Sequence, residues 1–136
     1  MVEAGIVVLI DTGISALSIP GGFAVQLPKN QISVTEPMAW TYRSIVSEEF
    51  YTLEGQDAYT EWEIQIDCHG YTMANSITLA RAIQEVLRGG WSGVLSDPDH
   101  TRVFGIQQEP PSIDGFSDIN RSYVRSLEYK IQYAQS

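Results

Sequence analysis

The sequence is poor in cysteine and in positive charge. Its 136 residues include one cysteine, Cys68, and eight Lys and Arg against seventeen Asp and Glu, which gives a formal net charge of −9. A single cysteine excludes an intramolecular disulfide. The acidic balance argues against wrapping nucleic acid, because duplex binding depends on Lys and Arg that neutralise phosphates, and against an anionic membrane surface.

Long apolar runs are also lacking. No stretch approaches the ~20 consecutive apolar residues of a transmembrane helix. The short run Gly5 to Ile10 has no basic segment before it, as a secretory signal would require. With 43% hydrophobic residues, a chain of this length can bury a core without disulfides or a structural metal. We therefore expect residues 1–136 to form a single soluble domain, made inside the cell.

Two segments have the period of a helix. From Glu3 to Leu17, apolar residues recur every three or four positions, and Pro20-Gly21-Gly22 ends the pattern. From Met73 to Arg88 the same period follows Thr72, a residue type that caps helix N-termini, and Gly89-Gly90 favours the C-terminus. The sequence therefore predicts two helices separated by more than fifty residues.

Four segments are predicted to be strands. The clearest is Glu61 to His69, which alternates apolar and polar residues and so has one buried face and one wet face. Its inward row is Trp62, Ile64, Ile66 and Cys68. The other three are Met38–Ser47, Arg102–Gln108 and Tyr123–Tyr133, and Phe23–Leu27 fits a short edge strand or an extended loop.

Three loops are predicted between these elements. These are Glu48–Thr60, which is acidic with interleaved aromatic residues, Trp91–His100, and Asp114–Asn120, which follows an interruption at Pro110-Pro111. The order of elements is helix, strands, helix, strands. We therefore predict an α+β domain with a mainly antiparallel four-stranded sheet and two helices packed on one face.

The triplet Asp67-Cys68-His69 resembles a nucleophile cluster on paper. Adjacent residues of a strand point to opposite faces, so Cys68 and His69 cannot face each other. An active thiol also needs an electropositive, accessible setting, which an apolar row does not provide. We expect Cys68 to be a buried core residue and His69 to be a polar residue at the strand end.

Two further clusters fail the spacing of known sites. Counted from Asp97, a loop containing Asp99 and His100 has Arg102 and Gln108 where an EF-hand needs Gly and Glu, so it fits a solvated turn better than a metal site. Gly90 to Val94 approaches the nucleophile elbow of hydrolases, but a predicted helix precedes it where a strand is needed. We accordingly predict no catalytic, metal-binding or cofactor-binding residue and no cofactor.

Several aromatic residues lie in the predicted strands. Trp40, Tyr42, Trp62, Tyr129 and Tyr133 are candidates for a stacking platform that binds single-stranded nucleic acid. Such a platform needs a basic groove, which this acidic chain does not offer. Core packing or subunit contact is the more common use of alternating strand aromatics.

The order and spacing of these segments resemble the tail completion, or tail terminator, proteins of long-tailed bacteriophages and related prophages. The resemblance covers most of the chain. It rests on the N-terminal helix, the stretch Gly21 to Pro28, the strand Pro37 to Tyr42 and, above all, Trp62 to His69 followed by Gly70 to Asn75 and the helix Leu79 to Ile83. The longer loops Glu48–Thr60 and Trp91–His100 depart from the shortest family members.

The resemblance implies a virion structural protein with no catalytic site, made in the host bacterial cytoplasm and incorporated into the tail. Such proteins form a ring, usually of six subunits, at the head-proximal end of the tail tube. The implied partners are other copies of the chain, the tube protein and the head connector protein. The ring ends tube growth and lets DNA pass without specific binding.

The acidic excess fits such a ring. Candidate residues facing its lumen are Glu61, Glu63, Asp67 and Glu128, whose charge would repel phosphate. Alternatively, these residues are only the wet face of a sheet. For the whole chain, the alternative function is that of a small intracellular α+β enzyme or ligand-binding domain, which predicts a concave pocket lined by titratable groups.

Overall fold

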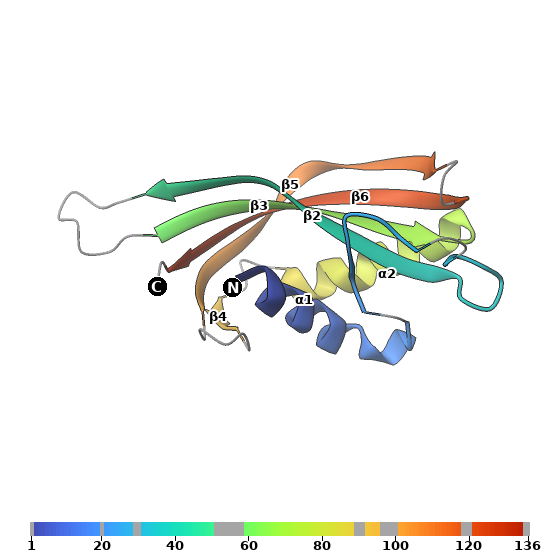
Figure 1. The fold of residues 1–136 in the computed structure, drawn as a ribbon, viewed down its shortest axis with the longest axis horizontal. Helices are drawn as coiled ribbons and strands as arrows, with labels where there is room; N and C mark the ends of the chain where they lie inside the picture. The colour runs from blue at the N-terminus through green and yellow to red at the C-terminus, as the bar shows by residue number, and fades with distance from the viewer. Residues whose placement is uncertain are drawn as a thin grey trace.

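The computed structural model describes residues 2–19, 21–28, 31–50, 59–88, 92–95, 101–117 and 121–134. The elements in chain order are α1 (Val2–Gly13), a short 3-10 helix (Ser15–Leu17), β1 (Phe23–Ala24), β2 (Met38–Phe50), β3 (Tyr59–Gly70), α2 (Met73–Leu87), β4 (Gly93–Val94), β5 (Arg102–Ser117) and β6 (Ser122–Ala134). The strands form one twisted sheet in the order β1-β2-β3-β6-β5-β4, and both helices lie on the same side of it (Figure 1).

The prediction of a four-stranded, mainly antiparallel sheet is wrong. The sheet has six strands and is mixed, because β1 runs parallel to β2 while the other neighbours pair antiparallel. The additional strands β1 and β4 contain two residues each and lie at the two edges of the sheet. Strand β1 lies within Phe23–Leu27, where a short edge strand was one of the two expected structures. Strand β4 lies in the predicted loop Trp91–His100, because an element this short has no periodicity that a sequence pattern can detect.

The predicted break after Gln108 is also wrong. Strand β5 continues to Ser117 and pairs with β6 on both sides of the Pro110-Pro111 pair. The register of this pairing shifts between Glu109 and Ile113, so the prolines fall in an irregularity of the ladder. A proline is tolerated at such a point because its missing N–H is not needed for a ladder hydrogen bond.

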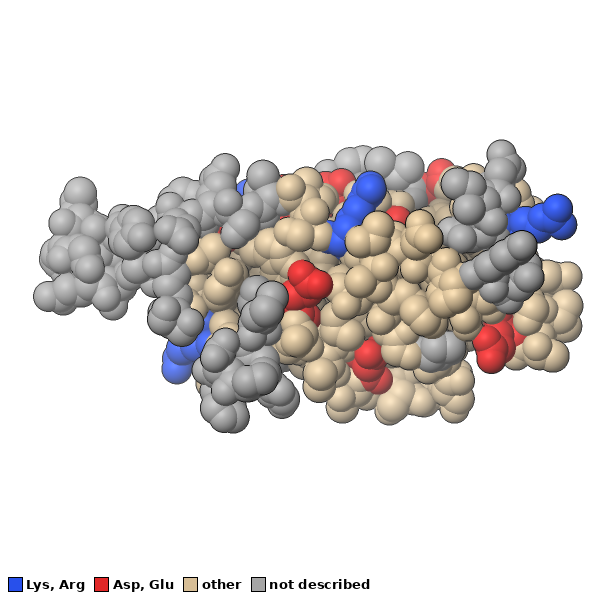
Figure 2. Space-filling model, in the orientation of Figure 1, with Lys and Arg blue, Asp and Glu red and all other residues tan. Residues whose placement is uncertain are grey.

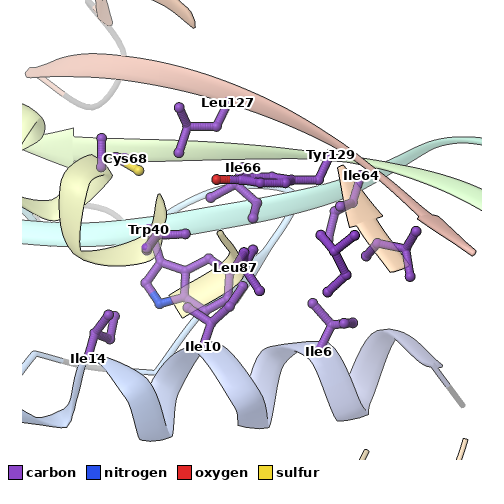
Figure 3. Close-up of a cluster of buried hydrophobic side chains, with 14 of the residues drawn as sticks. Ile6, Ile10, Ile14, Trp40, Ile64, Ile66, Cys68, Leu87, Leu127 and Tyr129 are labelled. Carbon is purple, nitrogen blue, oxygen red and sulfur yellow. The ribbon is translucent and has the colours of Figure 1, made fainter. Parts of the chain in front are cut away.

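The central strand β3 orders the core. Its inward residues Trp62, Ile64, Ile66 and Cys68 are buried, as the alternation predicts. Figure 3 shows Ile64, Ile66 and Cys68 of this row together with Leu127 and Tyr129 of β6, on the side of the sheet that faces Ile6 and Ile10 of α1 and Leu87 of α2. Helix α2 packs directly on β3 and β6, and α1 packs on α2. The apolar row of β3 therefore lies between the sheet and the helix layer.

One polar contact ties the N-terminal region to the sheet. The indole Nε1 of Trp40 donates a hydrogen bond to the Asp11 carboxylate at 3.1 Å, and the backbone N–H of Gly22 donates to the same group at 3.3 Å. Partial burial raises the pKa of Asp11, although both hydrogen bonds oppose this effect. A side chain at position 22 would collide with the Trp40 ring, with the Cβ 2.5 Å from the nearest ring carbon.

The junction between β3 and α2 is tightly packed at Gly70. The Thr72 hydroxyl accepts a hydrogen bond from the N–H of Asn75 at 3.2 Å, which is the predicted N-cap of α2. The chain turns so closely here that a Cβ on Gly70 would meet the backbone nitrogen of Ser76 and lie 2.6 Å from the carbonyl oxygen of Thr72. Glycine is therefore required at position 70 by the close approach of the backbone at the start of α2.

We predict that Gly70→Ala destabilises the protein by about 2 to 3 kcal/mol, because the backbone of α2 must move away from β3 to admit the methyl group. Urea unfolding followed by circular dichroism measures the change. The matched control is Gly105→Ala in β5, where an added Cβ meets no atom within 4 Å. Equal stability of the two variants would show that the junction is not the constraint described here.

Candidate functional site

The face of the sheet opposite the helices carries the acidic residues singled out from the sequence. Because β3 buries alternate side chains against the helices, the residues between them point the other way. In the pairing of β3 with β6, Glu61, Glu63 and Asp67 face Gln132, Lys130 and Ser126, and Gln65 faces Glu128. The structure therefore places all four predicted acidic residues on one surface, which we call the helix-free face.

Lys130 offsets part of this negative charge. Its ammonium lies 3.2 Å from Glu61, 3.8 Å from Glu63 and 3.4 Å from Glu109 of β5. The hydrogen bonds that it donates to Glu61 and Glu109 raise the pKa of the Lys130 ammonium. One cation on β6 therefore pairs with three carboxylates from two neighbouring strands, β3 and β5. The partnership of Lys130 with Glu109 depends on the pairing of β5 with β6.

Asp67 and Glu128 differ in their surroundings. The Asp67 carboxylate accepts a hydrogen bond from the Ser126 hydroxyl at 2.7 Å and another from the Gln65 amide at 2.9 Å. Glu128 is exposed and makes no hydrogen bond or ion pair with the described residues. Asp67 is thus held in a polar network, whereas Glu128 presents its charge to solvent.

His69 is more buried than the sequence suggested. It is 5% exposed, and its ring nitrogens lie 3.0 Å from the Thr41 hydroxyl and 3.1 Å from the Ser122 hydroxyl. Burial lowers the pKa of this imidazole, because it penalises the charged form, while the charge of Asp67 opposes the shift. The prediction of a merely polar residue at the strand end missed this network, because Thr41 and Ser122 come from strands distant in sequence.

A pocket opens beside His69 on the helix-free face. Its volume is about 300 Å³, and its polar lining includes Thr41, Asp67, His69 and Ser126. These groups already hydrogen-bond to neighbouring side chains. The hydrogen-bonding groups of Thr41, Asp67, His69 and Ser126 are consequently engaged within the protein.

The other candidate residues lie either in the core or in segments outside the described residues. Cys68 is fully buried, and burial raises the pKa of its thiol. The aromatic rings of Trp40, Trp62 and Tyr129 are buried, and those of Tyr42 and Tyr133 pack against the core. Asp97, Asp99 and His100, and the Gly90-Trp91 start of the elbow-like stretch, lie outside the described residues. Within the described ranges there is no group of three or more His, Cys, Asp or Glu suited to a metal ion, and no helix is long and apolar enough to cross a membrane.

Charge is dispersed over the surface seen in Figure 2. Acidic and basic side chains of the described residues are scattered among uncharged ones there, without a large patch of one sign. The concentration of carboxylates on the helix-free face thus follows from strand register and does not extend over the whole molecule.

Comparison with known proteins gives a likeness of fold. No family model and no curated protein matches the sequence. A chain from a solved structure described as the virion of a native gene transfer agent particle superposes with a TM-score of 0.58 at 11% identity, covering 93% of this chain and 84% of that one. At this identity the likeness shows that the two chains share a fold.

Acid should destabilise the folded protein through His69. The unfolded imidazole titrates near 6.5, whereas the buried one resists protonation and has a lower pKa. Below 6.5 the unfolded state therefore binds more protons, and stability falls as the pH drops toward the folded pKa. We predict that the stability lost between pH 7 and pH 5, measured by urea unfolding, is smaller in His69→Gln than in the parent. An equal loss in both proteins would assign the acid sensitivity to other groups.

Proposed function

We propose that this protein is a non-enzymatic structural component of a phage-like virion. It forms a ring of six subunits at the head-proximal end of the tail tube, where it ends tube growth and joins the tail to the head connector. The observation that carries the proposal is the fold shared with a gene transfer agent virion chain over 93% of this chain. The order of sequence segments, which resembles tail terminator proteins, gives the finer assignment to the tail.

The edges of the sheet support assembly into a closed ring. Strand β1 covers only Thr41 and Tyr42 of β2, and β4 covers only Arg102 and Val103 of β5. The remaining outer edges of β2 and β5 pair with no other described strand, and they lie on opposite sides of the sheet. An exposed strand edge can pair with a strand of another chain. When each subunit uses one surface to contact a different surface of the next, the subunits form a closed ring if the rotation between neighbours adds up to a full turn.

The helix-free face supports a role toward DNA. We propose that Glu61, Glu63, Asp67 and Glu128 line the lumen, where carboxylates keep phosphate from binding while DNA passes. Lys130 pairs with three carboxylates of this face and so offers little free positive charge to DNA. The lumen would then be polar and weakly repulsive toward the polymer.

The pocket beside His69 favours the second candidate, a small enzyme or ligand-binding domain. It places Asp67 and His69 at one hollow, as such a function requires. That function predicts that a small polar ligand protects the folded protein and that Asp67→Ala and His69→Ala remove this protection without unfolding the chain. The internal pairing of both side chains makes this the weaker candidate.

For the ring itself, we expect a particle of six times the 15.1 kDa chain mass, either in solution or on isolated tail tubes. Light scattering after size exclusion measures the free protein, and mass measurement of tubes before and after addition measures the bound form. A protein that stays monomeric and neither binds tubes nor enters particles would contradict the proposal.

For the lumen, we expect Glu63→Lys combined with Glu128→Lys to give the assembled protein a salt-dependent affinity for duplex DNA that the parent lacks. The control is Glu3→Lys combined with Glu36→Lys, which makes the same change of charge on α1 and in the loop before β2. Fluorescence anisotropy with a labelled duplex measures both. Equal DNA affinity of the two double variants would place the helix-free face away from the lumen.

A further inference from the structure

A second hollow runs along the opposite side of the sheet, between α2 and β5. Its volume is about 920 Å³, and it lies beside the part of the sheet on which α2 packs, which is β3, β6 and β2. The buried side chains Leu87 and Ile106 form its apolar floor, and Phe104 stands half-exposed in its lining. An amide hydrogen bond of 3.1 Å from Gln84 to Gln108 crosses between helix and strand. We call this hollow the α2–β5 groove.

The groove gathers positive charge on an acidic protein. The guanidinium side chains of Arg81 and Arg88 line it. Lys130 also borders the groove, but its ammonium pairs with carboxylates on the helix-free face. The single carboxylate in the lining is Glu85, which forms a solvent-exposed ion pair with Arg88 at 3.1 Å. Such an exposed pair is weak, so both arginines remain available to another partner. An apolar floor with a basic rim fits a segment that alternates acidic and aromatic residues.

The chain contains such a segment. Residues 48–59 include the carboxylates Glu48, Glu49, Glu54 and Asp57, together with Phe50, Tyr51, Leu53 and Tyr59, and they contain no Lys or Arg. In fact no Lys or Arg occurs between Arg43 and Arg81. In charge and apolar content this segment complements the α2–β5 groove.

The position of the segment favours a second copy as its source. It joins β2 to β3, whose last antiparallel pair is Phe50 with Tyr59. At this end, β2 and β3 run past the helices and away from the body of the molecule (Figure 1). The segment of a neighbouring subunit can therefore reach the groove, whereas binding within one chain would require β2 and β3 to bend back toward their own α2.

We propose that the α2–β5 groove binds residues 48–59 of a second copy of this chain. Arg81 and Arg88 attract the carboxylates of that segment, and its aromatic side chains cover Phe104 and the apolar floor. This contact joins two different surfaces, so it extends from subunit to subunit around a ring. The inference rests on the proposed ring and names the contact that holds its subunits together.

Charge exchange tests the contact. We expect Arg81→Glu combined with Arg88→Glu to weaken self-association about tenfold, as expected for two pairs worth roughly 0.7 kcal/mol each. Glu54→Arg combined with Asp57→Arg should weaken it similarly, and mixing the two double variants should restore it. Sedimentation velocity measures association, and circular dichroism confirms folding. The control is Arg121→Glu, an exposed charge reversal at the turn between β5 and β6. Unchanged association of both double variants would overturn the inference.

Cysteine pairing provides an independent measurement, because Cys68 is buried. Asp57→Cys and Arg81→Cys are prepared with different tags, mixed and oxidised. We expect a mixed disulfide between the two variants, and none when Arg121→Cys replaces Arg81→Cys. Absence of the mixed disulfide in an oligomer that still forms would overturn the inference and leave the ring intact. A mixed disulfide between pairs of chains that never form rings or bind tubes would support the contact and contradict the proposed function.

Discussion

The alternate burial of β3 side chains is the constraint on which the rest of the structure depends. Trp62, Ile64, Ile66 and Cys68 must face the helices to leave water, and a strand that buries these residues has to turn every intervening one to the opposite face. Because β3 lies between β2 and β6, this alternation fixes the direction of their side chains as well. A slip of one residue would exchange the apolar core with the row of carboxylates.

On the helix-free face, neighbouring side chains offset the electrostatic repulsion between adjacent carboxylates. Lys130 lies among three of them, and Asp67 accepts two hydrogen bonds from neutral side chains. Like charges on neighbouring strands are destabilising unless a cation or a donor stands between them. The face therefore retains an acidic character while its most crowded carboxylates are paired, and the Glu128 carboxylate remains exposed to solvent.

The sequence predicted the elements that have a strong periodic pattern of apolar residues, and it missed features that depend on how the strands pair. Helix α2 with its Thr72 cap, the first helix and the inward row of β3 follow from patterns within single segments. The two-residue strand β4 has no such pattern, and the continuation of β5 past Pro110-Pro111 depends on the register of β6. The burial of His69 was missed for the same reason, because its partners Thr41 and Ser122 arrive from other strands.

The shortage of positive charge unites the two surfaces that the proposals assign to function. With no Lys or Arg between Arg43 and Arg81, the whole of β3 and the connection before it carry only negative and neutral side chains. The cations come later, on α2 and β6, where Arg81 and Arg88 line the groove and Lys130 reaches the carboxylates. In the proposed ring, charge separated along the chain in this way would repel DNA at one surface and attract a neighbouring subunit at another. In such a ring, the same uneven distribution of charge would both hold neighbouring subunits together and prevent DNA from binding.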